Sequence, residues 1–203
     1  MFYEIATLEL RLWGAKKAME GLSAFAESPE SRGSLLGCWE VDVGSLGRML
    51  VLRGFDTAEA LAEDRQRLLR SSNPFNAGEV LNGFTVDSYV PFPFMPPVQP
   101  GQYGRLYEFR EYQLAAGGIP LTMAAWEEAL PARQAISPVV IAMHAMDGPP
   151  RMMHIVPYES FEARLMLRKE LYMKGIWPPK GAPEQITRAT STIALPTPIS
   201  KLA

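Results

Sequence analysis

The chain has 203 residues, of which 47% are hydrophobic and 21% charged, so it does not have the composition of an intrinsically disordered polymer. Lysine and arginine number 20 against 22 aspartates and glutamates, and this near-neutral balance gives no broad basic surface for nucleic acid. No apolar run approaches the roughly 18 residues of a membrane span. Cys38 is the only cysteine, which excludes a disulfide within the chain and favours a reducing, cytoplasmic location.

The prolines are unevenly placed, and five of them fall between residues 91 and 100. Each proline fixes its own φ angle and biases the preceding residue toward an extended backbone, so we expect a stiff connector there. This proline-rich connector divides the chain almost in half. We predict a first domain at residues 1–92, a proline-rich linker at 93–104 and a second domain at 105–203.

The first half shows the periodicities of a strand, a helix, two strands, a helix and a strand. Gly44 and Gly47 bound a hairpin turn between the middle strands, and Asp56 three residues before Glu59 resembles a capping box for the second helix. Alternating side chains indicate the strands, and apolar residues three and four apart indicate the first helix. The predicted elements are a strand at 2–10, a helix at 15–26, strands at 35–43 and 49–55, a helix at 57–70 and a strand at 84–90.

The second half repeats this order, and individual residues recur at matching positions. Tyr3-Glu4 is matched by Tyr107-Glu108, an offset of 104, and Arg65 is matched by Arg168 after a turn that is one residue shorter. The elements predicted here are a strand at 106–113, a helix at 123–133, strands at 139–146 and 152–156, a helix at 160–174 and a strand at 187–195. The chain therefore contains two tandem copies of one structural unit.

The order β-α-β-β-α-β is that of the ferredoxin-like unit, whose antiparallel sheet carries helices on one face only. The bare face needs a partner, and a second copy in the same chain supplies it by packing sheet on sheet or by closing into a barrel. We therefore predict an α+β protein in which two tandem ferredoxin-like repeats form a pseudo-dimer. We also expect homo-oligomers to assemble through exposed edges or helices.

Strand alternation at 106–113 places Glu108, Arg110 and Tyr112 on one face, opposite Tyr107 and Phe109. If the two rings pack under the helices, the charged trio faces the interior between the sheets, and this is the arrangement we expect. An arginine beside a tyrosine there could orient a carboxylate or an enolate and stabilise its negative charge. The alternative is that Arg110 only pairs with a glutamate.

His144 and His154 are the only histidines, and they fall on adjacent predicted strands. A neutral imidazole could take a proton from an activated carbon, for which His154 is the better candidate. The alternative is a structural, hydrogen-bonding role. Two histidines without a cluster of cysteines or carboxylates do not predict a metal site.

Arg65 and Arg168 occupy equivalent places on the last predicted helix of each half. Because the position is repeated, it indicates a role that both halves share. We expect each arginine to form a buried or half-buried salt bridge to a strand carboxylate, such as Glu4 or Glu108.

Short motifs are spread over both halves. They are Tyr3-Glu4-Ile5, residues 33–39, residues 44–47 and Phe55-Asp56-Thr57 in the first half, and residues 107–112, Trp126, Ala132-Arg133, residues 154–158, Arg164, Arg168, residues 175–179 and residues 196–200 in the second. With these motifs the chain resembles the NIPSNAP family, in the dimeric α+β-barrel superfamily. The resemblance implies a fold shared with cofactor-free monooxygenases and haem-binding barrels, and it assigns no reaction. Two positions differ, since the family often has Trp where Val156 stands and His where Val51 stands.

Together these observations predict that a small molecule binds in the barrel interior, with no metal ion and no cofactor. His154 and Arg110 are the candidate catalytic residues. The predicted binding residues are Tyr107, Glu108, Tyr112, His144 and Trp177. Cofactor-free oxygenase or isomerase chemistry would fit this set. The alternative is a non-catalytic interaction or scaffold protein, in which the polar residues only fix the pairing of the two repeats.

Overall fold

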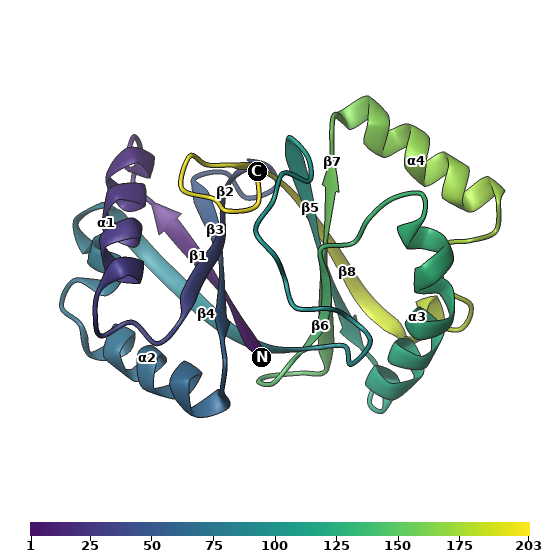
Figure 1. The fold of residues 1–203 in the computed structure, drawn as a ribbon, viewed down its shortest axis with the longest axis horizontal. Coiled ribbons are helices and arrows are strands. Elements are labelled where there is room, and N and C mark those ends of the chain that lie inside the picture. The colour runs from purple at the N-terminus through teal and green to yellow at the C-terminus, as the bar shows by residue number, and fades with distance from the viewer.

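Two four-stranded units face each other in the computed structural model, which describes residues 1–203 (Figure 1). Each unit turns its sheet toward the other and carries two helices on the outside. No helix combines the length and the apolar character that crossing a membrane requires.

The first unit follows the predicted order. Its elements are β1 (Phe2–Leu10), α1 (Ala15–Glu27), β2 (Ser34–Val43), β3 (Arg48–Phe55), α2 (Ala58–Arg70), the short 3-10 turns η1 (Pro74–Asn76) and η2 (Gly78–Val80), and β4 (Leu81–Pro91). The helix α2 begins one residue later than the capping box suggests, because Thr57 is the N-cap and its side chain accepts a hydrogen bond from the Ala60 amide. Asp56 is therefore not the cap.

The second unit has the same order with two changes of boundary. Its elements are β5 (Leu106–Leu114), α3 (Gly118–Gln134), β6 (Ile141–Ala145), β7 (Arg151–Tyr158), α4 (Phe161–Met173), the 3-10 turn η3 (Pro183–Gln185) and β8 (Ile186–Pro196). The helix α3 begins five residues before its predicted start, after Gly117 in a left-handed conformation. The strand β6 starts late because the Gln134 side chain accepts the hydrogen bond of the Val139 amide.

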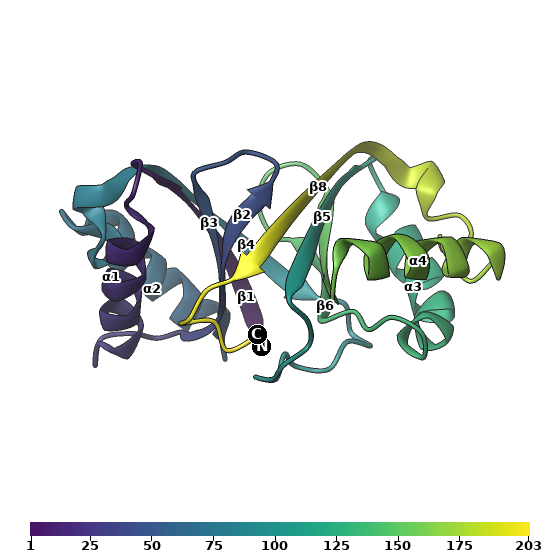
Figure 2. The same cartoon turned by 90° about the horizontal axis from the view of Figure 1, so that it is seen from above.

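The eight strands form one closed antiparallel barrel, in the order β1-β3-β2-β8-β5-β7-β6-β4. Within each unit the order is that of a ferredoxin-like sheet, and the units join where β2 pairs with β8 and β4 pairs with β6. Figure 2 shows β2, β8 and β5 running side by side across one such junction. The predicted fold class is confirmed: two tandem ferredoxin-like repeats make an α+β barrel of the dimeric type within one chain.

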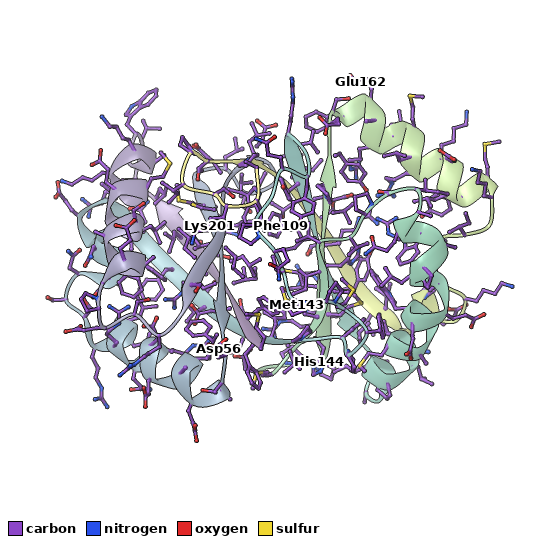
Figure 3. The ribbon with its side chains drawn as sticks, viewed as in Figure 1. Asp56, Phe109, Met143, His144, Glu162 and Lys201 are labelled. Atoms are coloured by element: carbon purple, nitrogen blue, oxygen red, sulfur yellow. The ribbon has the colours of Figure 1, made fainter.

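The barrel interior is mainly apolar, and Tyr107 and Phe109 belong to it. Figure 3 shows Phe109 and Met143 between the two sheets. The predicted orientation of β5 was therefore wrong, since Glu108 and Arg110 face the helices. Both faces of this strand are covered, so alternation alone does not say which face meets the other sheet. Helices α2 and α4 supply arginines for the strand glutamates, whereas the facing sheet supplies mostly apolar side chains.

The connector and the C-terminal tail cover one end of the barrel. Val98 is buried in the interior cluster, and its amide donates a hydrogen bond to the Tyr3 hydroxyl at 3.0 Å. Gly101 pairs with Leu202 of the tail. Further along β1 and β5, a cavity of about 140 Å³ remains inside the barrel. Its polar lining is Thr7, Ser45, Arg48, Asp87, Glu111, Thr190 and Thr192.

Candidate functional site

The predicted site residues do not gather in the barrel interior. Tyr107 lies there, packed against Trp39 with ring centroids 5.2 Å apart. Arg110, His154 and Trp177 instead line a pocket on the other side of the second sheet, under α3 and α4. The predicted location of the site was thus wrong for these residues, although the structure does bring them together.

Tyr112 and His144 also lie on the helix-facing side of the second sheet. Tyr112 packs against the apolar cluster beneath the helices, and its ring lies 5.4 Å from that of His154. His144 follows Met143 on β6 and faces the opposite way, toward Phe92, at a ring distance of 6.5 Å (Figure 3). It does not line the pocket, so the two histidines do not form one site.

Glu108 is the buried centre of a cluster of cations. It accepts hydrogen bonds from Arg164 and from Ser191, both at 2.6 Å, and forms ion pairs with Arg110 at 2.9 Å and Arg168 at 3.6 Å. Burial alone would raise the pKa of Glu108, but the two hydrogen bonds and the nearby guanidinium charges lower it to about 2. The predicted pairing of Arg110 with a glutamate and of Arg168 with Glu108 is confirmed.

Arg133 is a buried cation that the sequence analysis did not assign to the site. It comes from the last turn of α3, is 3% exposed, and its guanidinium lies 4.7 Å from the centre of the Trp177 ring. Its Nε atom has no hydrogen-bond partner, and it is not among the arginines that pair with Glu108. Burial lowers the pKa of Arg133, as expected for a cation held away from water.

His154 is 2% exposed and lies in the middle of β7. Its ring contacts Trp126 of α3 at a centroid distance of 4.8 Å, and its Nδ1 atom has no hydrogen-bond partner. Burial, and then the charges of Arg133 and Arg110, hold the pKa of His154 well below 6.5. The imidazole is therefore neutral at pH 7, with a nitrogen free to accept a proton.

The enclosed space between these side chains is small. It measures about 20 Å³, which is room for roughly one water molecule. The lining residues are Arg110, Arg133, His154, Val156, Tyr158, Arg168, Leu171, Tyr172 and Trp177. Helix α4 forms one wall and buries only Leu171, whereas α3 buries five of its residues. Helix α4 is thus the more weakly packed of the two helices.

The first unit contains a charge-balanced version of this cluster. Three arginines meet three carboxylates there, and the pairs are Arg53 with Glu4 and Asp64, Arg65 with Glu4 and Asp147, and Arg67 with Asp64. Arg53 and both of its carboxylate partners are fully buried. The predicted pairing of Arg65 with Glu4 is confirmed. No charge in this network lacks a partner, so the network has a structural role.

In the second unit the buried positive and negative charges are not balanced. By the offset between the repeats, Leu167 stands where Asp64 does, Val156 where Arg53 does, and Val43 is the counterpart of Asp147. The remaining cluster has four arginines and one carboxylate, a surplus of three positive charges; its members are Arg110, Arg133, Arg164, Arg168 and Glu108. The same fold thus carries a neutral network in one unit and a cationic pocket in the other.

Eight side chains of this site were not among the predicted site residues: Trp126, Arg133, Val156, Tyr158, Arg164, Arg168, Leu171 and Tyr172. A comparison of the two repeats would have indicated Arg164, because its counterpart is Leu61. Trp126 and Arg133 are seven residues apart on α3, the spacing of one helix face. Spacing alone does not show that this face covers His154.

Comparison with known proteins agrees with the architecture. A candidate monooxygenase from Lactobacillus acidophilus NCFM superimposes with a TM-score of 0.69 at 13% identity, covering 96% of this chain and 93% of its own. An anthrone oxidase-like protein superimposes with a TM-score of 0.70 at 9% identity, covering 100% of this chain and 95% of its own. A chlorite dismutase variant from Candidatus Nitrospira defluvii superimposes with a TM-score of 0.60 at 13% identity, covering 97% of this chain and 91% of its own. These likenesses concern the fold alone. No curated protein matches the sequence.

The NIPSNAP family profile matches the chain twice, at residues 3–96 and at residues 107–201. Each match spans one ferredoxin-like unit, and together they leave out only the ends and part of the proline-rich connector. With both units of the barrel matched, the chain belongs to the NIPSNAP family and carries its unit in tandem.

Proposed function

We propose that this protein binds a small organic molecule in the pocket between the second sheet and helices α3 and α4. The observation that carries the proposal is the pair of unpartnered nitrogens, Nδ1 of His154 and Nε of Arg133, in one buried pocket. A buried polar group without a partner costs about 1–3 kcal/mol, so two in one place indicate a missing partner. A ligand that hydrogen-bonds both nitrogens would remove that cost, and it would need an outward shift of α4 to enter the space of about 20 Å³.

The arrangement supports abstraction of a proton from a carbon next to a carbonyl group. Neutral His154 would take the proton at Nδ1, and the electron pair of the broken C–H bond would pass to the carbonyl oxygen as an enolate. Guanidinium groups of Arg110 and Arg133 would stabilise the enolate oxygen. If the substrate carries a β,γ double bond, return of the proton to the γ carbon of the dienolate shifts that double bond and completes an isomerisation. Attack of the enolate carbon on dioxygen as co-substrate would begin an oxygenation.

Neighbours described as a candidate monooxygenase and as an anthrone oxidase-like protein are consistent with oxidative chemistry on this fold. Another neighbour is described as a heme-binding protein from Thermus thermophilus, with a TM-score of 0.52. The residues here do not fit that group, because the ring of His154, the single histidine that lines the pocket, is packed against Trp126.

Deuterium exchange tests the proposal. Phenylpyruvate, a 2-oxo acid with an enolisable methylene group, would be incubated with the protein in D₂O while NMR follows loss of the methylene protons. We expect exchange above the buffer rate, and its loss in His154→Val, which copies the natural Val51 of the first unit. His144→Ala, which alters the histidine outside the pocket, is the matched control. Equal exchange by the wild type and His154→Val would refute the assignment of His154.

A second candidate function, protein interaction through α4, is favoured by the outer surface of that helix. Its exposed apolar residues are Phe161, Leu165, Met166, Tyr172 and Met173. A second copy of the chain is the occupant we propose, because two copies of α4 facing each other would cover the apolar residues of both helices. Size-exclusion chromatography with light scattering would show a dimer that Leu165→Glu converts to a monomer. A wild-type monomer at all concentrations would exclude this self-association.

A further inference from the structure

We infer that the ligand of the α3/α4 pocket is an organic anion, with a carboxylate or phosphate group held by the arginines and a planar apolar part against the pocket's rings. The inference rests on the proposed function and names the substrate class of that site. It is carried by the difference between the two units, which share a fold and differ in charge.

Apart from Arg168, the cations of the second unit do not come from the positions of the first network, and no buried aspartate accompanies them. In the first unit, Asp64 is fully buried and pairs with Arg53 and Arg67. The second unit has Leu167, Val156 and Glu170 at these three positions, and its additional arginines are Arg110, Arg133 and Arg164. A ligand anion would restore the balance that a protein carboxylate provides in the first unit.

Glu108 alone does not balance the arginines around it. It already pairs with Arg110, Arg164 and Arg168, and Tyr158 lies at 3.5 Å from its second oxygen. Arg133 remains buried without an ion pair. Buried charges in proteins are normally paired, so an unpaired arginine beside three that share one carboxylate indicates an external anion.

The rings that line the pocket favour a planar ligand. They belong to His154, Tyr158, Tyr172 and Trp177. Trp126 lies behind two of them, with its ring centroid 4.8 Å from that of His154 and 4.6 Å from that of Trp177. Guanidinium and aromatic surfaces together favour a planar anion, because carboxylates bind guanidinium in a fork and rings pack on rings. The negative group would lie at Arg133, and the planar part would lie beside His154.

The experiment compares benzoate, phenyl phosphate and the neutral isostere benzamide by calorimetric titration and thermal shift. We expect benzoate or phenyl phosphate to bind at least about tenfold more tightly than benzamide, the worth of one charge-assisted hydrogen bond. The preferred anion then distinguishes a carboxylate from a phosphate ligand. Benzamide binding as tightly as benzoate, or no binding by either anion, would overturn the inference.

Two substitutions test where the anion binds in the pocket. Arg133→Met should lose benzoate binding while the chain stays folded, because it removes an unpaired charge and keeps an apolar stem. Val43→Asp introduces, at a half-exposed position, the counterpart of Asp147, and the relation between the two units would place it toward Arg168 as Asp147 lies toward Arg65. It should weaken benzoate binding while raising the melting temperature without ligand. Arg65→Met, in the first unit, is the matched control and should lower stability with benzoate affinity unchanged. Unchanged benzoate affinity in Arg133→Met would overturn the placement.

This test can fail separately from the proposed function. Phenylpyruvate exchange that depends on His154, together with equal affinity for benzamide and benzoate, would retain the pocket and reject the anion. Benzoate binding that depends on Arg133, without exchange above the buffer rate, would retain the anion and reject the proton-transfer chemistry.

Discussion

Arg65 of α2 and Arg168 of α4 are equivalent residues that reach equivalent glutamates, but only Arg65 has a second carboxylate. Arg65 lies 3.2 Å from Glu4 and 3.3 Å from Asp147, whereas Arg168 lies 3.6 Å from Glu108 alone. Asp147 sits in the turn between β6 and β7 and also accepts a hydrogen bond from the Ser88 amide. The same arginine therefore closes a structural network in one unit and contributes an unbalanced charge in the other.

Removal of the central carboxylate should affect the two units unequally. We expect Glu108→Gln to destabilise the fold by about 3–5 kcal/mol, because its arginines would have no other carboxylate. Glu4→Gln should cost less, since Arg53 keeps Asp64 and Arg65 keeps Asp147. Urea denaturation of both variants measures the difference, and equal losses would contradict the charge imbalance.

Acid should destabilise the protein in two steps. Each group whose folded pKa lies below its unfolded value stabilises the fold above that unfolded value and loses this contribution as the pH falls. For His154 the loss begins below about 6.5, and for Glu108 it runs from about 4.5 to 2 and amounts to about 3 kcal/mol. Melting temperatures between pH 4 and 8 should show the first step in the wild type and not in His154→Val.

Loss of either helix N-cap should lower the stability of the fold by a similar amount, but only one of the two caps should affect ligand binding. Thr57 caps α2 and Ser160 caps α4 through hydrogen bonds to the amides of Ala60 and Ala163. We expect alanine at either cap to cost about 1 kcal/mol. Only Ser160→Ala should also change the affinity for benzoate, because α4 forms a wall of the pocket. The paired measurement is urea denaturation and calorimetric titration.

Trp13 occupies a backbone position that suits glycine. Its φ is +65°, its side chain is 91% exposed, and the equivalent residue of the second unit is Gly117, with φ of +79°. A left-handed conformation costs a residue with a Cβ atom about 1 kcal/mol, and this exposed ring gains little packing. We expect Trp13→Gly to raise the free energy of unfolding by roughly that amount. A loss of stability would show that the ring makes contacts that matter.

Cys38 should be inert in the folded protein. It is fully buried on β2, and burial raises the pKa of its thiol to about 12. A chromogenic disulfide reagent should modify it only in denaturant. Rapid reaction of the native protein would show that β2 opens at its junction with β8.

The sequence by itself determined the repeat, the order of the elements and the fold class, because period-two strands, helix spacing and matched pairs such as Tyr3-Glu4 and Tyr107-Glu108 are local patterns. It also predicted the pairing of Arg65 with Glu4 and of Arg168 with Glu108. Only the tertiary structure decided which face of β5 meets the other sheet, because both of its faces are covered. The tertiary structure also decided that Arg133 and Trp126 of α3 lie beside His154, because these residues are far apart in the chain. The candidate site therefore lies beneath α3 and α4, whereas the sequence predicted it in the barrel interior.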